Sequence, residues 1–137
     1  MFTIFQAQAT PATPALLGRY AAQYDIPMDP QGATLQMLVD GRYALRLRAL
    51  PRDAVMVSAR LRTLPAPGRA RDELLMAFAR LACGTMKEQP TTCSIDARER
   101  AIWLQLPAPA QSLQDIDDAV GRFVNSLAFW SKASLPL

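Results

Sequence analysis

Hydrophobic residues recur with two different periods along this chain, and the changes between the periods predict its elements. Near the N-terminus, Thr13 and Pro14 suit the start of a helix, and apolar residues then recur at helical spacing as far as Tyr24. The same spacing returns at 69–87 and at 112–130, where the apolar residues form one stripe. The pattern therefore predicts three helices.

Between these helices the period changes to two, which is typical of strands with one buried face. Asp40-Gly41 supplies a tight turn between the first two strands. In the third strand the alternation places Arg60 and Arg62 together on the polar face. Pro107-Ala108-Pro109 is expected to separate the last strand from the last helix. The predicted strands are 33–39, 43–50, 54–62, 92–96 and 101–106.

The resulting order, α-β-β-β-α-β-β-α, is typical of an α+β domain in which an antiparallel sheet of about five strands carries the helices on one face. A chain of 137 residues suits one such domain. We expect this domain to span residues 13–137. A flexible N-terminal arm is expected at 1–12, because Pro11 and Pro14 separate this segment from the first helix.

The composition argues against several classes of function. The chain has no histidine, which removes histidine-based acid–base catalysis, histidine-activated nucleophiles and most zinc sites. Nine residues separate Cys83 from Cys93, so the two fit reduced structural thiols better than a redox or metal motif. No apolar run is long enough to span a bilayer, and the first residues lack the basic start of a signal peptide. We expect a cytoplasmic protein with no cofactor, no metal and no membrane partner.

The acidic residues do not indicate an enzyme. Asp115, Asp117 and Asp118 form the only acidic cluster, and they open a predicted helix, where negative charge stabilises the N-terminus. The sequence has no phosphate loop, dinucleotide fingerprint or metal-ligand spacing. We therefore expect no catalytic residue.

Arginine dominates the positive charge, since thirteen arginines stand against two lysines at a net charge of +3. Arginine favours forked, specific contacts over diffuse charge. Six arginines lie within 42–62 against one acid, Asp53, which leaves an arginine-rich nucleic-acid-binding module open as an alternative. The predicted polar face there has no aromatic ring among its arginines. Proteins that bind single-stranded nucleic acid on a β-sheet rely on bases stacking on aromatic side chains. We expect no nucleic-acid partner.

Several short stretches of the predicted elements follow a known layout. They are Leu-Leu at 16–17, Leu-x-x-x-Val-Asp-Gly at 35–41, Ala-Arg-Leu at 59–61 with Leu-Pro at 64–65, Glu-Leu-Leu at 73–75, Ile-Trp-Leu-Gln-Leu at 102–106, and Phe123 and Trp130 in the last helix. With the element order, they make the chain resemble the class I type III secretion chaperones, the family that includes the chaperone of the translocated intimin receptor. The likeness extends from about Leu16 to Trp130 and consists of packing patterns. Family members are usually acidic, whereas this chain has a pI near 9.2.

The resemblance implies a bacterial cytoplasmic homodimer without enzymatic activity or cofactor. Its partner would be the N-terminal segment of a secreted effector, held in extended form ready for secretion, and the family also suggests the secretion ATPase as a partner. For the dimer interface it points to the second helix and the last strands, where Leu75 and Phe78 are candidates. Trp103 is a third candidate, because its position in the strand places its side chain on the face opposite to Ile102 and Leu104. We expect Trp103 to lie either in the dimer contact or under a helix. A homodimeric interaction module unconnected with secretion stays an alternative.

Apolar side chains that leave the core, and arginines beside them, are the candidate effector contacts. Met37 and Leu38 are adjacent in a strand, so one of them faces outward, and Met56 lies on a polar face. A core stripe is the simpler interpretation of Leu17 and Tyr20, and a solvated face explains the arginines equally well. The candidates are Leu17, Tyr20, Tyr24, Leu38, Met56, Arg46, Arg48, Arg60 and Arg62.

Overall fold

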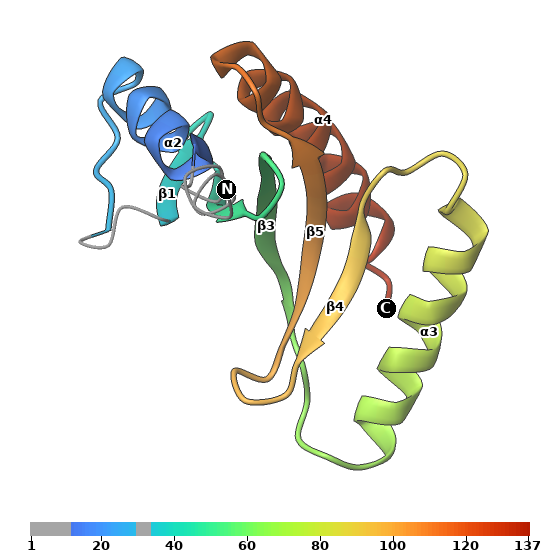
Figure 1. Cartoon of the computed structure of the whole chain (residues 1–137). Coiled ribbons are helices and arrows are strands. Elements are labelled where there is room, and N and C mark those ends of the chain that lie inside the picture. Colours follow the sequence, from blue (N-terminus) through green and yellow to red (C-terminus); the bar gives the residue numbers. More distant parts are fainter. Residues whose placement is uncertain (1–11, 30–33) are drawn as a thin grey trace, which may run out of the picture.

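The computed structural model describes residues 12–29 and 34–137, and this part of the chain forms three helices and a five-stranded antiparallel sheet. The predicted order and the α+β class are confirmed (Figure 1). The predicted arm at 1–12 lies outside the described residues, except for Ala12, which begins the first helix. The elements are α2 (Ala12–Gln23), β1 (Thr34–Val39), β2 (Tyr43–Leu50), β3 (Ala54–Thr63), α3 (Arg69–Thr85), β4 (Thr92–Asp96), β5 (Ala101–Pro109) and α4 (Leu113–Ala133).

The strands lie in the order β1-β2-β3-β5-β4, and all neighbours are antiparallel. The β1–β2 hairpin turns through Asp40 and Gly41, whose φ angles are 57° and 62°. The Arg42 N–H donates to the Val39 carbonyl across this turn at 3.0 Å. Aspartate and glycine tolerate the left-handed region better than most residues, so this dipeptide sets the register of the hairpin.

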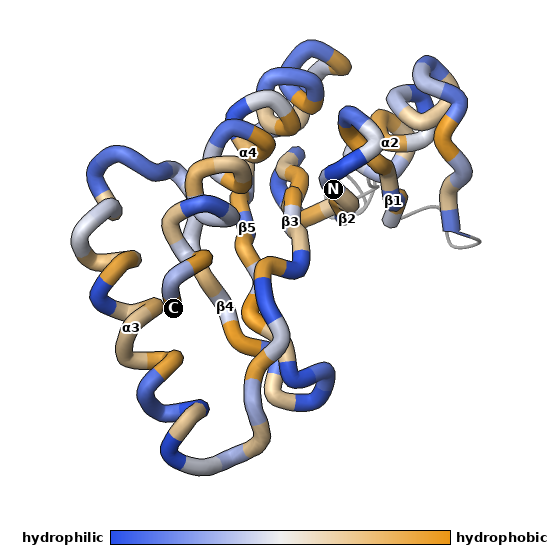
Figure 2. Tube along the Cα trace, turned by 180° about the vertical axis from the view of Figure 1, so that it is seen from behind, coloured by the Kyte–Doolittle hydropathy of each residue, from blue (hydrophilic) through white to orange (hydrophobic). Residues whose placement is uncertain are grey.

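The helices α2 and α4 cover one face of the sheet and enclose the core (Figure 1). Inward strand positions such as Leu47, Val57 and Leu104 are fully buried, as are Leu17 of α2 and Phe123 of α4. Figure 2 shows the hydrophobic stretches of β3 and β5 in the middle of the molecule. The alternation along the strands thus builds two layers, and the opposite sheet face carries no described helix.

The start of α4 is fixed by two hydrogen bonds that involve Asp115. The Ser112 side chain accepts the Asp115 N–H at 3.1 Å, and the Asp115 carboxylate accepts the Gln111 N–H at 2.9 Å. The first bond satisfies an N–H group that a helix start leaves without a partner, and the second ties the residue before the cap to the first turn. Capping therefore places the beginning of α4 directly after β5.

The strand β5 extends to Pro109, so the expectation that the Pro-Ala-Pro stretch separates strand from helix is wrong. Pro107 and Pro109 both pair with β3, while pairing with β4 stops at Gln105. The Ala110 N–H donates to the Asp53 carbonyl of the β2–β3 turn. Because successive N–H groups of a strand point to opposite sides, the N–H groups of the even-numbered residues of β5 point toward β3. The two proline nitrogens therefore lie on the side that β4 leaves free, where no N–H is needed.

The register of β3 against β5 shifts between Arg60 and Arg62. Arg60 stays on the uncovered face, whereas Arg62 pairs with the buried residue Ile102 and turns toward the helices. The Arg62 guanidinium donates to the carbonyls of Ser134 and Leu137 at 2.9 and 3.0 Å. The prediction that both arginines share the polar face is wrong, because the bulge reverses the alternation beyond it.

The helix α3 differs from the expectation that all helices lie on one face of the sheet. It packs closely against no strand and runs beside β4, beyond the edge of the sheet (Figure 1). Phe78 is its one buried residue and stacks on Trp130 of α4, with ring centroids 6.0 Å apart. The rest of the apolar stripe of α3 is half-buried or exposed and lacks a full covering surface.

Candidate functional site

The uncovered side of the sheet, here called the open face, carries arginines from β2 and β3. Pairing sets Arg48 opposite Met56 and Arg60 opposite Trp103, with Arg46 on the same face of β2. Arg48 and Arg60 are exposed, and the other three are half-buried. The open face consists of Gln36, Leu38, Ala44, Arg46, Arg48, Met56, Ser58, Arg60, Ser94, Trp103 and Gln105.

Arg46 lies over the ring of Trp103, with its guanidinium carbon 4.8 Å from the ring centroid. The residues belong to different strands, and β3 lies between them. A guanidinium stacked on an aromatic face keeps its in-plane N–H groups available to fork onto an acceptor. The indole N–H of Trp103 is buried and has no hydrogen-bond partner within the described residues, so packing and cation–π attraction hold this pair.

The arginines of the open face carry charge that the fold does not neutralise. Within residues 12–29 and 34–137, no carboxylate forms an ion pair with Arg46, Arg48 or Arg60. Arg60 donates one hydrogen bond to the Thr63 hydroxyl at 3.2 Å. Most of the guanidinium donors on this face therefore have no hydrogen-bond or ion-pair partner among the described residues.

Acidic residues mark one end of the open face, at the β4–β5 turn. Asp96 and Glu99 border the same hollow as Arg46 and Arg48. The Asp96 carboxylate accepts the N–H groups of Glu99 and Arg98 at 3.0 Å each, and these bonds, that of Glu99 first, hold the pKa of Asp96 below its ordinary value. The Asp96 carboxylate thus stabilises the β4–β5 turn.

A second surface lies at the edge strand β1. Leu38 is 63% exposed and Tyr24 is 46% exposed, and both border a hollow of about 470 Å³ between α2, β1 and α4. The segment after α2 pairs with the first part of β1 through a bridge between Met28 and Leu35. Beyond this bridge, the outer edge of β1 pairs with no strand of the described chain.

Tyr20 of α2 and Tyr24, which directly follows this helix, converge on one carboxylate oxygen of α4. The hydroxyls of Tyr20 and Tyr24 donate to Asp117 Oδ1 at 3.0 and 3.2 Å. Burial is the largest cause of the raised pKa of Tyr20, followed by its hydrogen bond to Asp117. For Tyr24, its own hydrogen bond to Asp117 is the largest cause of the raised pKa. This cluster ties α2 to α4 and forms one wall of the hollow beside β1.

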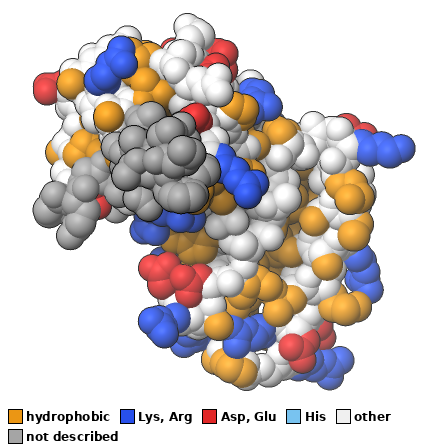
Figure 3. All heavy atoms as spheres, in the orientation of Figure 1, with side chains coloured by type: hydrophobic (Ala, Val, Ile, Leu, Met, Phe, Trp, Pro, Cys, Tyr) orange, Lys and Arg blue, Asp and Glu red, His pale blue; other side chains and the backbone are white. Residues whose placement is uncertain are grey.

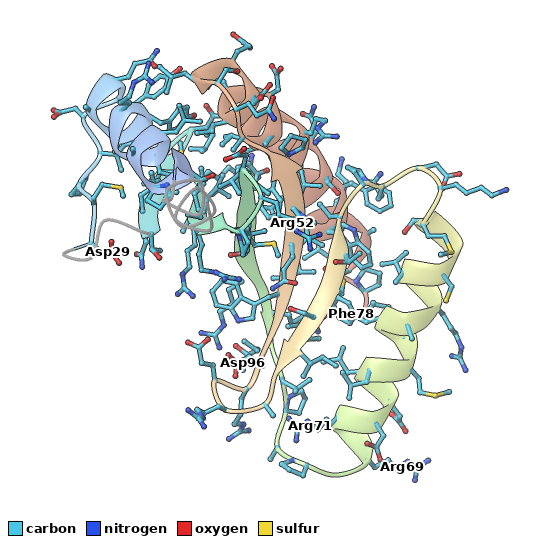
Figure 4. The ribbon with its side chains drawn as sticks, viewed as in Figure 1. Asp29, Arg52, Arg69, Arg71, Phe78 and Asp96 are labelled. Atoms are coloured by element: carbon cyan, nitrogen blue, oxygen red, sulfur yellow. The ribbon has the colours of Figure 1, made fainter. Side chains whose placement is uncertain are left out.

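A third surface is an apolar groove of about 610 Å³ between α3 and β4, here called the α3 groove. Met86 and Ile95 line it and are 72% and 55% exposed. Figure 3 shows hydrophobic side chains gathered along α3, and Figure 4 places Phe78 between α3 and the sheet. Cys83 and Cys93 also line the groove, and burial raises the pKa of the Cys93 thiol to about 11.

The predicted effector contacts separate into buried and surface residues. Leu17 and Tyr20 are 0% and 2% exposed and belong to the core, which agrees with the simpler interpretation of the stripe. Arg62 lies on the helix side of the sheet. The others are at the surface: Tyr24 and Leu38 near the edge of β1, and Arg46, Arg48, Met56 and Arg60 on the open face.

The predicted dimer residues do not share one surface. Leu75 and Phe78 line the α3 groove. Trp103 faces outward as its parity indicates, but it lies on the open face beneath Arg46 and under no described helix. These two locations are on opposite sides of the sheet, because Ile102 borders the groove and its neighbour Trp103 does not.

Met86 and Ile95, which line the α3 groove, are not among the interface residues predicted from the sequence. Ile95 has the parity of an inward strand residue, opposite Ile102. It is nevertheless exposed, because β4 is the edge strand and α4 packs over β3 and β5 instead. Nothing in the local sequence indicates which strand lies beyond the reach of a helix.

The described chain offers no alternative chemistry at these surfaces. Among residues 12–29 and 34–137, no group of three or more cysteine, aspartate or glutamate side chains is placed to hold a metal ion. No described helix has the length and apolar character needed to cross a membrane.

The comparisons with known proteins agree with this geometry. No protein-family model and no curated protein sequence matches the chain. A chain of the ExsC–ExsE complex matches with a TM-score of 0.59 at 17% identity, covering 90% of this chain and 96% of that one. A chain of the HopA1–SchA chaperone–effector complex matches with a TM-score of 0.58 at 14% identity, covering 86% and 91%.

A third match has a similar coverage and TM-score. It is to a chain of the heterodimeric ExoU–SpcU complex from the type III secretion system of Pseudomonas aeruginosa, with a TM-score of 0.59 at 15% identity, covering 86% of this chain and 93% of that one. The chain therefore has the fold of the class I type III secretion chaperones. The resemblance inferred from the sequence is confirmed at the level of the fold.

Proposed function

We propose that this chain is a bacterial cytoplasmic type III secretion chaperone, which binds the N-terminal segment of an effector and keeps it extended and competent for secretion. One observation carries the proposal: 86–90% of the chain shares its fold with chains from the HopA1–SchA chaperone–effector complex, the ExsC–ExsE complex and the ExoU–SpcU complex of a type III secretion system. The protein would act by binding alone, without a chemical step. Release of the client by a secretion ATPase belongs to the same proposal.

The edge of β1 is suited to an extended client. Beyond the Met28–Leu35 bridge, its outer main-chain groups pair with no strand of residues 12–29 and 34–137, and an added strand could pair with them. Leu38 and Tyr24, beside the same hollow, offer apolar contacts for alternate side chains of that strand. Main-chain bonds supply affinity for a chain that is not folded, and the hollow supplies selectivity.

The α3 groove is suited to a second copy of this chain. Exposed apolar residues such as Met86 and Ile95 on both sides of one groove indicate a surface that association covers. Leu75 and Phe78 border it. We place the homodimer contact at this groove and leave Trp103 out of it, because Trp103 lies on the other side of the sheet.

Co-expression with candidate effectors tests the chaperone function. The chain should copurify with an effector through its N-terminal region, at two copies of the chain per client. That region should be cleaved readily in the free client, because it is unfolded, and should be protected in the complex where it pairs with β1. Leu38→Ser should weaken this complex at least about tenfold, since it removes an exposed apolar contact. Leu135→Ser is the matched control, because Leu135 is 77% exposed and lies away from β1.

Two results would contradict the proposal. One is a chain that retains no protein client from a bacterium with a type III secretion system. The other is a client that binds in its folded form, so that its N-terminal region is protected from proteolysis with and without the chain.

Light scattering tests the dimer separately. Ile95→Asp should convert the dimer to a monomer, because it buries a charge in an apolar contact. Leu38→Asp should leave the mass unchanged, because Leu38 lies in β1 and does not line the groove. Equal masses for the two variants would move the dimer contact away from the α3 groove.

A further inference from the structure

We propose that the open face selects clients by charge, and that it binds an extended segment carrying carboxylates at alternate positions. This inference rests on the proposed function, because it names the chemistry of the client. Its starting point is the unneutralised charge of Arg46, Arg48 and Arg60, which belong to adjacent strands of one sheet face.

Three guanidinium groups on one face repel one another, and a bound anion relieves that repulsion. Within the described ranges no carboxylate pairs with them, and most of their donors are unused. Arg46 is held in place by the ring of Trp103 at 4.8 Å, so its donors are pre-oriented toward the open side. Fixing a guanidinium in advance reduces the entropy lost when a carboxylate binds.

The spacing of the arginines favours alternate acids. Arg46 and Arg48 are two positions apart on β2, so their side chains leave the same face about 7 Å apart. An extended peptide presents every second side chain to one side with the same repeat. Aspartate or glutamate at positions i and i+2 would therefore meet both arginines together.

The apolar neighbours favour a peptide over a nucleic acid. Leu38 and Met56 lie on the same face and can contact apolar side chains of the segment. Among the described residues of the open face, Trp103 is the one aromatic residue, and Arg46 already covers its ring, so none of these residues offers a free ring for base stacking. Asp96 and Glu99 at the β4–β5 turn would repel a long polyanion, which limits the acidic stretch to the part over β2 and β3.

Binding of short fluorescent peptides tests the inference, with anisotropy measured at about 50 and about 200 mM salt. The first probe alternates aspartate with valine, and the second replaces each aspartate by asparagine. A short oligothymidylate is the third probe. The acidic peptide should bind at least about tenfold more tightly than its amide counterpart, and the difference should shrink with salt.

A charge-matched pair of variants locates the effect. Arg46→Gln with Arg48→Gln removes two positive charges from the open face, and Arg122→Gln with Lys132→Gln removes two from the exposed side of α4. The first variant should lose at least about tenfold in affinity for the acidic peptide, whereas the second should lose less than about threefold. Thermal melting of both variants establishes that each is folded.

The outcomes separate this inference from the proposed function. Equal binding of the acidic and amide peptides, or equal losses in the two variants, would overturn charge selection while leaving copurification of a client intact. Tighter binding of oligothymidylate than of the acidic peptide, abolished only by the open-face variant, would overturn it in favour of a nucleic-acid surface. Failure to copurify any client would overturn the proposed function, whatever the peptides show.

Discussion

The rings of Phe78 and Trp130 are parallel within 3°, with centroids 6.0 Å apart, and this contact joins α3 to α4. Phe78 is 4% exposed and Trp130 is 1% exposed, so the stack is buried although the rest of α3 is not. Phe129 also meets Trp130 edge-on, with centroids 6.2 Å apart. A single aromatic anchor therefore holds a helix that packs closely on no strand.

Phe78→Ala should lower the free energy of unfolding by about 3–5 kcal/mol, because it removes the buried ring and leaves a cavity beside Trp130. Urea denaturation followed by circular dichroism measures this change. Met76→Ala is the control on the same helix, since Met76 is 55% exposed and should cost about 0.5 kcal/mol or less. Equal losses in the two variants would mean that Phe78 does not anchor α3.

Tyr20→Phe should lower the free energy of unfolding by about 1 kcal/mol at neutral pH, because a hydrogen bond to Asp117 is lost. The raised pKa of Tyr20 also sets a pH dependence. The fold favours the neutral phenol, so this stability is fully present below the ordinary tyrosine pKa of about 10 and falls as the pH rises from there. The variant should therefore lose less stability than the wild type above pH about 10.

Urea denaturation at several alkaline pH values measures both effects of the Tyr20 substitution. Tyr24→Phe is the control, because its hydroxyl binds the same oxygen from an exposed position and should matter less. A Tyr20 variant that follows the wild-type alkaline decline would exclude this tyrosine as its source.

The cysteines should differ in reactivity. Burial raises the pKa of Cys93 to about 11, whereas Cys83 is exposed. Iodoacetamide reacts with the thiolate, so at pH about 8 the Cys83→Ser variant should be labelled at least about tenfold more slowly than Cys93→Ser. Labelling of Cys93 should accelerate as the pH rises toward 11.

The same reagent reports on association, because Cys83 borders the α3 groove. If the second copy covers the groove, Cys83 should react faster on dilution below the dimer dissociation constant. A rate that is independent of concentration would count against the groove as the dimer contact.

Arg62→Gln should release the C-terminal residues from β3. Arg62 donates to the carbonyls of Ser134 and Leu137, and loss of these bonds should cost about 1–3 kcal/mol because the donor is charged. Hydrogen exchange should accelerate in residues 134–137 and stay unchanged in β1. Arg60→Gln is the control, since Arg60 is exposed and reaches only Thr63; faster exchange in both variants would point to a general loss of stability.

The helices and strands can be predicted from the sequence alone, because their signals are local. Alternation along β2 separates Leu45 and Leu47 from Arg46 and Arg48, and the structure buries the leucines as predicted. The Asp40-Gly41 turn and the Ser112 cap act over three or four residues, so they can be recognised without knowing the fold. The same reasoning found the outward parity of Trp103, which the structure confirms.

Which helices and strands cover one another could not be predicted, because it depends on packing between distant segments. Periodicity indicates that a side chain is covered, but not what covers it, so Leu17 became core while Ile95 of the same apolar character stayed exposed. The side taken by Arg62 depends on a register shift against β5, which follows it by some forty residues in the chain. The placement of Arg46 over Trp103 likewise requires β2, β3 and β5 to lie side by side, and contacts between distant segments have no local signal.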